Sequence, residues 1–186
     1  THRFTHGVED DRSHLYWYLD DLAAKRVEDR RALHQKWKEK LPLERMTEKS
    51  EIVRRLADTN GDRTLDESKV FADGFNDVLD GTLAGVFAHE GAVYIGCIPK
   101  LLMLRDTNDD GRADERKTIE EGFGVRVSLS GHDLNGFALG PDGRIYGTVG
   151  DRGFSFKTKA GVVCDYPNQG AVFRFDARRV VESLLH

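Results

Sequence analysis

The sequence predicts a mainly β protein: part of a β-propeller built from four-stranded antiparallel blades, with an α-helical insert. Two aspartate-rich segments recur with a constant offset of 48 residues, which aligns Asp58 with Asp106 and Phe75 with Phe123. Short strand-like runs separated by turn residues fill the chain after residue 50. A repeat of roughly 40–50 residues made of short strands is typical of a propeller blade. The residues before 50 carry helical periodicity instead, which predicts the insert.

The insert is expected to span residues 10–48, with helix over residues 10–41. In its first part, apolar residues recur at helical spacing, and Asp10, Asp11 or Ser13 is available as an N-cap. Pro42 is expected to end the helical segment. The expected apolar residues are Leu15, Tyr18, Leu19, Leu22 and Ala23 in the first part and Leu33, Trp37 and Leu41 in the second.

The second part of the insert also has a basic face. Such a charge run is usually a solvated helix face, and the alternative is a lid or a surface that docks a partner. The face consists of Arg30, Arg31, Lys36, Lys38 and Lys40.

The strands can be laid out on the repeat period. The chain is then a single propeller portion, residues 1–186, with blade repeats at 50–121 and 122–176. One complete blade is expected from strands at 83–89, 92–98, 100–105 and 115–121. The next blade is expected from strands at 134–139, 144–149 and 171–176, with a fourth strand beyond the end of the chain. The preceding blade contributes strands at 51–57 and 68–73, and residues 1–4 are the end of its second strand.

A hairpin is predicted around Pro141-Asp142-Gly143, because Pro presets φ and Gly accepts a positive φ. His132 precedes its first strand and Asp151 follows its second, so both lie at the end opposite the turn. A carboxylate beside an imidazole fixes the tautomer and raises the basicity of the ring. The two residues are therefore a candidate catalytic pair. The plainer alternative is a loop histidine and a turn aspartate.

The layout also predicts which segments share a face. In an up-and-down blade, successive connections alternate between the two faces. His132, the loop 151–170 and the helical insert should therefore lie on one face. The aspartate-rich hairpins should lie on the opposite face.

The two aspartate-rich hairpins are candidate calcium loops, because they place oxygen ligands at loop positions 1, 3, 5 and 9 and a backbone carbonyl at position 7. The glutamate that an EF-hand has at position 12 is replaced by Lys69 and Lys117, and Arg63 replaces the usual glycine at position 6. The alternative is a polar turn without an ion. The candidate ligands are Asp58, Asn60, Asp62, Thr64 and Asp66 in the first loop and Asp106, Asn108, Asp110, Arg112 and Asp114 in the second, with Thr64 and Arg112 acting through their carbonyls.

The stretch SGHDLNGFALGPDGRIYGTVGDRG, residues 130–153, resembles the corresponding part of soluble quinoprotein glucose dehydrogenases and of related sorbosone (aldose) dehydrogenases. The calcium-type repeats with FADGF and EEGFG are still more similar to a dehydrogenase-like propeller family of large secreted bacterial proteins. The resemblance covers roughly residues 50–176. It implies a propeller of about six blades and a periplasmic or secreted location.

The resemblance also implies roles for the candidate pair. His132 would be the general base that takes a sugar hydroxyl proton as hydride passes to pyrroloquinoline quinone, and Asp151 would orient it. The sequence departs from the dehydrogenases where Phe154-Ser155-Phe156 replaces a substrate-binding glutamine. The cationic residues that hold the quinone would lie in blades outside this chain.

Composition narrows the partners. The formal net charge is −4 and carboxylates are spread along the chain, so nucleic acid is not an expected partner. No apolar run approaches the roughly 18 residues of a transmembrane helix. The chain starts at Thr1 rather than Met, which indicates processing or excision from a longer protein. A partial propeller has open sheet edges. We therefore expect further chain, a second copy or a rearranged fold to cover them.

The two cysteines, Cys97 and Cys164, are far apart and form no CxxC motif, which excludes a zinc ribbon or a redox motif. Both are expected on the face that carries His132. They form either a disulfide or two separate thiols.

Three functions are compatible with these features. The first is a quinone-dependent oxidoreductase acting on the CH–OH group of a sugar or other polyol, with His132 as general base and Ca²⁺ bound in the hairpins. The second is a non-catalytic, calcium-stabilised propeller that binds carbohydrate or a protein partner. The third is a hydrolase or lyase that uses the same pair as acid and base.

Overall fold

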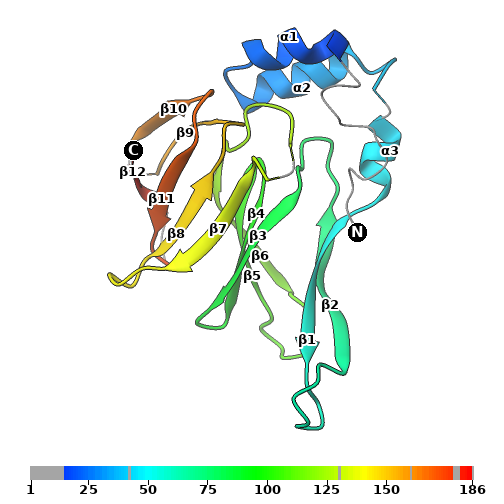
Figure 1. Ribbon diagram of the computed structural model, residues 1–186, viewed down its shortest axis with the longest axis vertical. Coiled ribbons are helices and arrows are strands. Elements are labelled where there is room, and N and C mark those ends of the chain that lie inside the picture. The colour runs from blue at the N-terminus through cyan, green and yellow to red at the C-terminus, as the bar shows by residue number, and fades with distance from the viewer. Residues whose placement is uncertain (1–14, 42, 130, 160, 178–180, 186) are drawn as a thin grey trace.

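The protein is mainly β, and its described residues form antiparallel sheets of two to four strands and three short helices (Figure 1). The computed structural model describes residues 15–41, 43–129, 131–159, 161–177 and 181–185. The expected strand at residues 1–4, the N-cap candidates Asp10, Asp11 and Ser13, and Pro42 lie outside the described residues. Among the described residues, no helix is long and apolar enough to cross a membrane.

The two predicted helical stretches correspond to two helices, and a third helix follows them within the predicted insert. They are α1 (Leu15–Ala23), α2 (Val27–Lys36) and α3 (Leu43–Glu48). The break before α2 is stabilised by Asp29, whose carboxylate accepts the backbone N–H of Lys25 at 2.8 Å and of Arg26 at 3.0 Å. A carboxylate that takes up free N–H groups at a helix start favours a new helix there.

The predicted apolar face of α1 is wrong. Trp17 is 2% exposed and packs with Leu33, Leu41 and Val127, whereas Leu19 is 76% exposed. Tyr18 and Leu22 are also exposed. The spacing of the leucines gave a regular stripe, but tertiary packing selects the face that carries the tryptophan, because the larger ring buries more apolar area.

The basic face of α2 is confirmed as solvated for most of its members, with one exception. Arg31 and Lys36 of α2 are exposed, as are Lys38 and Lys40 in the turn that follows the helix. Arg30 is 2% exposed, and its guanidinium donates to the carbonyl of Leu79 at 2.8 Å and to that of Arg126 at 3.3 Å. Arg30 therefore attaches α2 to the β-sheet loops beneath it.

The first repeat hairpin is a two-stranded sheet of β1 (Glu51–Ala57) and β2 (Glu67–Phe75). The next sheet is the expected complete four-stranded unit, in the order β3-β4-β5-β6. Its strands are β3 (Leu83–His89), β4 (Ala92–Cys97), β5 (Lys100–Arg105) and β6 (Glu115–Glu121).

The second four-stranded sheet corrects two expectations. Its order is β12-β11-β8-β7, so the fourth strand lies within the chain and not beyond its end. The segment 151–170, expected as a loop, contains a short hairpin of β9 and β10. The strands are β7 (Leu134–Leu139), β8 (Ile145–Val149), β9 (Phe154–Lys157), β10 (Val163–Tyr166), β11 (Ala171–Phe175) and β12 (Val181–Leu185).

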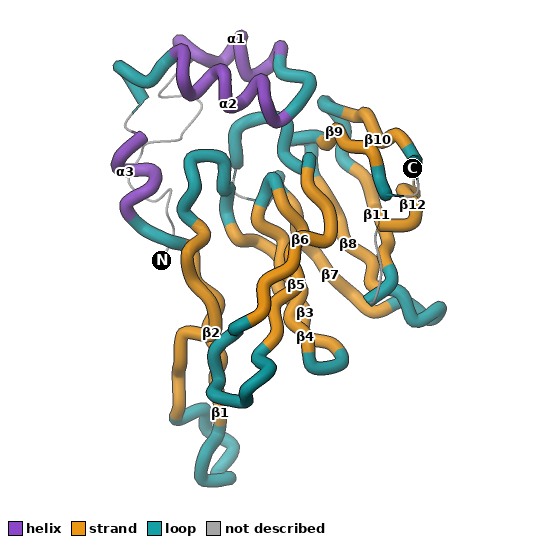
Figure 2. Tube along the Cα trace, turned by 180° about the vertical axis from the view of Figure 1, so that it is seen from behind, coloured by secondary structure: helices purple, strands orange, loops and turns teal. Residues whose placement is uncertain are grey.

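Successive sheets pack face to face, in the order in which they occur along the chain (Figures 1 and 2). One apolar cluster joins β1–β2 to the first four-stranded sheet and includes Phe71, Phe75 and Leu104. A second cluster joins the two four-stranded sheets around Phe123 and Phe173, whose ring centroids are 5.2 Å apart. Cys97 belongs to the first cluster and Cys164 to the second, and no disulfide joins them, so the two-thiol alternative is the one observed.

Glycines on β3 and β4 allow the first four-stranded sheet to approach β7 of the second sheet closely. A Cβ at Gly96 would lie 2.4 Å from the carbonyl oxygen of Leu134, and one at Gly85 would lie 3.1 Å from Cα of Asn135. Real side chains do not tolerate such contacts with backbone. Glycine at these positions therefore sets the spacing between β3, β4 and β7.

Candidate functional site

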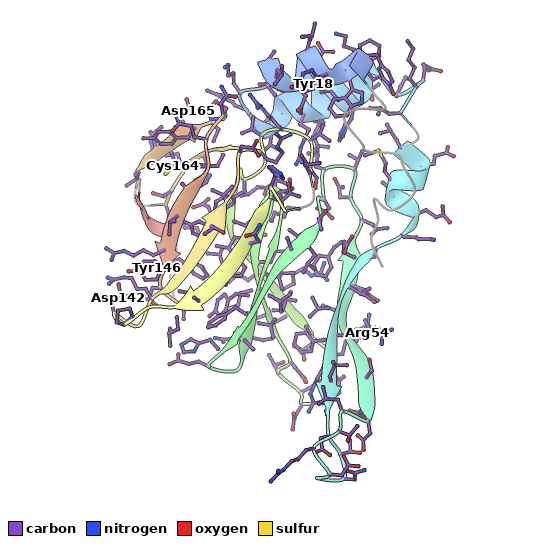
Figure 3. The ribbon with its side chains drawn as sticks, in the orientation of Figure 1. Tyr18, Arg54, Asp142, Tyr146, Cys164 and Asp165 are labelled. Atoms are coloured by element: carbon purple, nitrogen blue, oxygen red, sulfur yellow. The ribbon has the colours of Figure 1, made fainter. Side chains whose placement is uncertain are left out.

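The β7–β8 hairpin positions the predicted pair as expected. Its turn is closed by the N–H of Gly140, which donates to the carbonyl of Arg144 at 2.8 Å. Tyr146 donates to Asp142 at 3.1 Å at this tip, where both side chains are seen in Figure 3. At the other end, the N–H of Gly150 donates to the carbonyl of Asp133 at 3.1 Å. That contact brings the segments that carry His132 and Asp151 together.

His132 and Asp151 are in direct contact. Nδ1 of His132 lies 2.8 Å from Oδ1 of Asp151, and the two side chains are 50% and 52% exposed. A carboxylate can only accept hydrogen bonds, so Nδ1 carries the proton in this contact. The opposite ring nitrogen, Nε2, is then the basic atom of the pair.

Arg152 links this pair to the helical segment. Its guanidinium lies 3.3 Å from Oδ1 and 3.2 Å from Oδ2 of Asp151. On its other side, Nη1 lies 3.8 Å from Oδ2 of Asp21 in α1. Asp21 is 1% exposed and accepts the backbone N–H of Val127 at 2.7 Å. A continuous polar chain therefore runs from α1 through Arg152 and Asp151 to His132.

The charges around Asp151 keep it ionised. Burial by itself would raise the pKa of this carboxyl. The hydrogen bonds from Arg152 and then from His132 outweigh that effect and hold the pKa below its ordinary value. Asp151 is therefore a stable acceptor for the imidazole proton.

A second carboxyl, Asp133, lies beside the pair in sequence but is fully buried. It accepts the hydroxyl of Ser128 and the backbone N–H of Leu129. Ser128 in turn accepts the N–H of Thr82 at 3.1 Å. Burial raises the pKa of Asp133, against the lowering effect of these hydrogen bonds and of Arg30. This network fixes the loop that carries His132.

Sequence reasoning missed Arg152, Asp21, Arg30 and Asp133. Arg152 and Asp133 stand next to the predicted pair, but adjacency did not show that they are buried. Asp21 had a usable signal: it follows Trp17 by four residues and precedes Ala24 by three, which is the buried helical face.

The two aspartate-rich hairpins share a left-handed backbone at two positions, and both lie at the end of the molecule away from α1 and α2 (Figures 1 and 2). Position 4 of each loop has a left-handed backbone, with φ of +80° at Gly61 and +60° at Asp109. Position 6 does as well, with φ of +71° at Arg63 and +87° at Gly111.

Their side-chain hydrogen bonds also repeat. The N–H at position 6 donates to the position-1 aspartate at 2.7 Å in the first loop and at 2.8 Å in the second. Thr59 and Thr107 donate, through N–H and hydroxyl, to Asp66 and Asp114. The 48-residue repeat is thus a structural repeat of the two hairpins.

The donor chemistry of these loops suits a hard cation. The N–H of Arg63 lowers the pKa of Asp58 and the N–H of Thr64 lowers that of Asp62, so both carboxylates are ionised. The side chains of Asp66 and Asp114 are engaged by the threonines. Among the described residues, no three His, Cys, Asp or Glu side chains converge as a metal centre. Asp58, Asn60, Asp62 and the carbonyl of Thr64, with their counterparts Asp106, Asn108, Asp110 and the carbonyl of Arg112, would hold Ca²⁺.

Among the described residues, the cation adjacent to His132 is not available to an anionic quinone. Such a cofactor needs exposed cations, and the adjacent Arg152 is buried and engaged by Asp151 and Asp21. No residue of this chain is assigned to pyrroloquinoline quinone.

Fold and site define a mainly β protein with a histidine–aspartate pair on the face that carries its helices. The chain belongs to the family described as Domain of unknown function (DUF7133), whose model matches residues 32–184. No curated protein and no solved structure matches the chain.

Proposed function

We propose that this chain is part of a calcium-stabilised β-propeller whose helix-bearing face carries a general base acting on the CH–OH group of a sugar or other polyol, as in a dehydrogenase. The contact of 2.8 Å between His132 and Asp151 carries the proposal. A positioned imidazole with a carboxylate on its far nitrogen is a common arrangement for proton abstraction.

The packing of the sheets supports the propeller. Two four-stranded antiparallel sheets and a half sheet stack face to face in chain order. Their first strands, β3 and β7, lie next to each other, as the inner strands of neighbouring blades do. Both edges of the β1–β2 hairpin lack a partner strand among the described residues. We propose that further chain or a second copy completes the missing half blade.

The mechanism proposed for this chain is limited to proton transfer. Nε2 of His132 takes the proton of the substrate hydroxyl, and Asp151 stabilises the resulting imidazolium. Arg152 holds Asp151 in place from the side away from the ring. The substrate carbon would lose a hydride as it becomes a carbonyl carbon, and an oxidant held outside the described residues would have to accept that hydride.

Calcium is proposed as a structural clamp at the opposite end of the sheets. Loops of this kind bind Ca²⁺ with Kd values of about 10⁻⁴–10⁻³ M in extracellular modules. Such affinities are useful where calcium is abundant, so we propose a periplasmic or secreted location.

A non-catalytic propeller that binds carbohydrate or a protein partner is the second candidate. It is favoured by the segment that replaces the substrate-binding glutamine of the dehydrogenases. Phe154 is fully buried, and Phe156 packs against Phe123 with ring centroids 4.9 Å apart. These side chains belong to the core and do not present a polar group to a substrate at the pair.

The test is a titration of metal-stripped protein with pyrroloquinoline quinone, with and without Ca²⁺, followed by dye-linked oxidation of an aldose panel. Substitution His132→Ala should lower turnover by about 10²–10⁴-fold, the usual contribution of a general base. His89→Ala, a histidine on β3, is the matched control and should leave turnover unchanged. Quinone binding without turnover would favour the non-catalytic candidate, and product formation without dye would favour hydrolysis or elimination.

A further inference from the structure

A polar cavity of about 300 Å³ lies on the face that carries the helices, between α2, the end of β6 and β9. It is separate from the His132–Asp151 pair, but the chain segment that follows Asp151 forms one of its walls. The segment that begins at Arg152 pairs with residues 122–126, and the N–H of Ser155 donates to the carbonyl of Gly122 at 2.9 Å in the cavity wall.

Glu120 supplies a hydrogen-bond acceptor without a donor. One carboxylate oxygen accepts the backbone N–H of Glu121 at 3.3 Å. The other oxygen is buried and has no hydrogen-bond partner among the described residues. Burial also raises the pKa of this carboxyl, which shows that its surroundings solvate the charge poorly. Buried polar atoms in native proteins are nearly always paired, so this oxygen would gain a partner if the side chain of Glu120, which lines the cavity, turned toward a ligand there.

The remaining walls supply both donors and acceptors. Glu28 and Arg31 come from α2, Glu121 ends β6, and Lys157 comes from β9. With Glu120, the lining holds three carboxylates and two cations, which disfavours a strongly charged ligand of either sign. Carboxylates only accept hydrogen bonds, and guanidinium and ammonium groups only donate them.

A hydroxyl both donates and accepts, so a ligand with several hydroxyl groups satisfies both kinds of wall. Phe156 adds an apolar ring surface, which suits the C–H face of a sugar ring. The cavity volume lies at the lower end of the range of about 300–1,000 Å³ that is usual for small-molecule pockets. Its size therefore corresponds to a single sugar unit.

We propose that this cavity is a binding site for a neutral monosaccharide or polyol, held by Glu120 and Arg31 against Phe156 and distinct from the His132–Asp151 pair. The proposed function provides a use for such a site, but the site does not depend on it. The carboxylate of Glu120 accepts a hydrogen bond from a ligand hydroxyl, and Arg31 donates one to a ligand oxygen.

The experiment is an NMR titration of the full chain with glucose and sorbitol as neutral probes, glucosamine as the cationic probe and gluconate as the anionic probe. Glucose or sorbitol should shift the amide signals of residues 120–122 and 155–157. Glu120→Gln and Arg31→Met should each weaken that binding at least about fivefold. Glu115→Gln, an exposed glutamate on the same strand, is the control and should leave it unchanged.

The proposal would be overturned by no shifts at the cavity with either neutral probe, by unchanged affinity in both variants, or by tighter binding of glucosamine or gluconate than of glucose. His132→Ala separates this proposal from the dehydrogenase. Retained glucose binding in that variant supports a distinct site whether or not the wild type turns over an aldose. Loss of glucose binding would place the sugar at the pair instead and would overturn the proposal.

Discussion

Asp21 and Arg152 face each other as a buried pair, with Nη1 and Oδ2 3.8 Å apart and side chains 1% and 9% exposed. One residue is in α1 and the other follows the strand that leads to Asp151. This pair therefore connects the helical segment to the candidate general base. The connection makes α1 part of the site and not only a cover over it.

The first prediction concerns this pair. Arg152→Met leaves the buried charge of Asp21 without its cation, so it should lower the free energy of unfolding by about 3–5 kcal/mol, as measured by urea denaturation. Asp21→Asn keeps an acceptor for the N–H of Val127 and should cost less. The exposed Arg31→Met, on α2, should change stability by no more than about 0.5 kcal/mol.

The same variants test whether Arg152 positions the base. In the wild type, Nδ1 of His132 should carry the proton, which ¹⁵N chemical shifts of the ring report directly. In Arg152→Met, Asp151 loses its second partner, and the ring should move toward the mixture of tautomers found in free histidine. An unchanged tautomer in a folded Arg152→Met protein would show that Arg152 has a purely structural role.

The second prediction is a pH effect at Asp133. Its folded-state pKa is raised, so its contribution to stability is fully present below the ordinary value of 3.8 and is lost as pH rises through the folded pKa. Asp133→Asn keeps an acceptor for Ser128 and Leu129 but cannot ionise. The fall in stability above about pH 4 should therefore be shallower in this variant than in the wild type.

The third prediction uses the match between Arg63 and Gly111. Both have a left-handed backbone, which costs a residue with a side chain roughly 1–2 kcal/mol. Arg63→Gly should therefore stabilise the protein, by about 0.5–1 kcal/mol after the greater freedom of glycine in the unfolded chain is counted. Gly111→Ala should have the opposite effect, since its Cβ would also lie 3.3 Å from Arg55. Melting temperatures of the two variants test the prediction, which fails if both shift in the same direction.

The fourth prediction concerns calcium removal. If the hairpins bind Ca²⁺, free calcium at about ten times Kd should add about 1.4 kcal/mol of stability per independent site. Calorimetric melting with chelator and with added Ca²⁺ measures this increment. Asp58→Ala and Asp106→Ala should each remove the stability increment from one calcium site. Asp142→Ala, in the hairpin turn between β7 and β8, should leave the increments from both sites unchanged. An increment of zero in the wild type would leave the loops as hydrogen-bonded turns.

Local sequence signals predicted the strands well, because turn chemistry and the 48-residue repeat specify where strands begin and end. The contact between His132 and Asp151 followed from hairpin geometry, since the two ends of a hairpin must meet. The β9–β10 hairpin was not predicted because its strands are only four residues each, and the second of them lacks alternation. The separate thiols of Cys97 and Cys164 depend on how sheets pack, and the sequence left that choice open.

The buried charges were the least predictable part. Arg30 looked like one of five solvated bases, and only its long-range partners, the carbonyls of Leu79 and Arg126, distinguish it. Asp133 looked like a loop residue until its burial was known. In both cases the environment is made by segments far away in sequence, so neither spacing nor composition could identify it.

The last prediction tests the face of α1 that the leucine pattern misassigned. Trp17 lies in the cluster with Leu33, Leu41 and Val127, so Trp17→Ala should destabilise the protein by about 3–5 kcal/mol through lost burial and the cavity left behind. Leu19 is 76% exposed, and Leu19→Ala should change stability by no more than about 0.5 kcal/mol. Denaturant unfolding of both variants compares the two faces directly. A larger loss for Leu19→Ala than for Trp17→Ala would mean that α1 packs through its leucine stripe, and the contact between Asp21 and Arg152 would then be incompatible with the helix orientation.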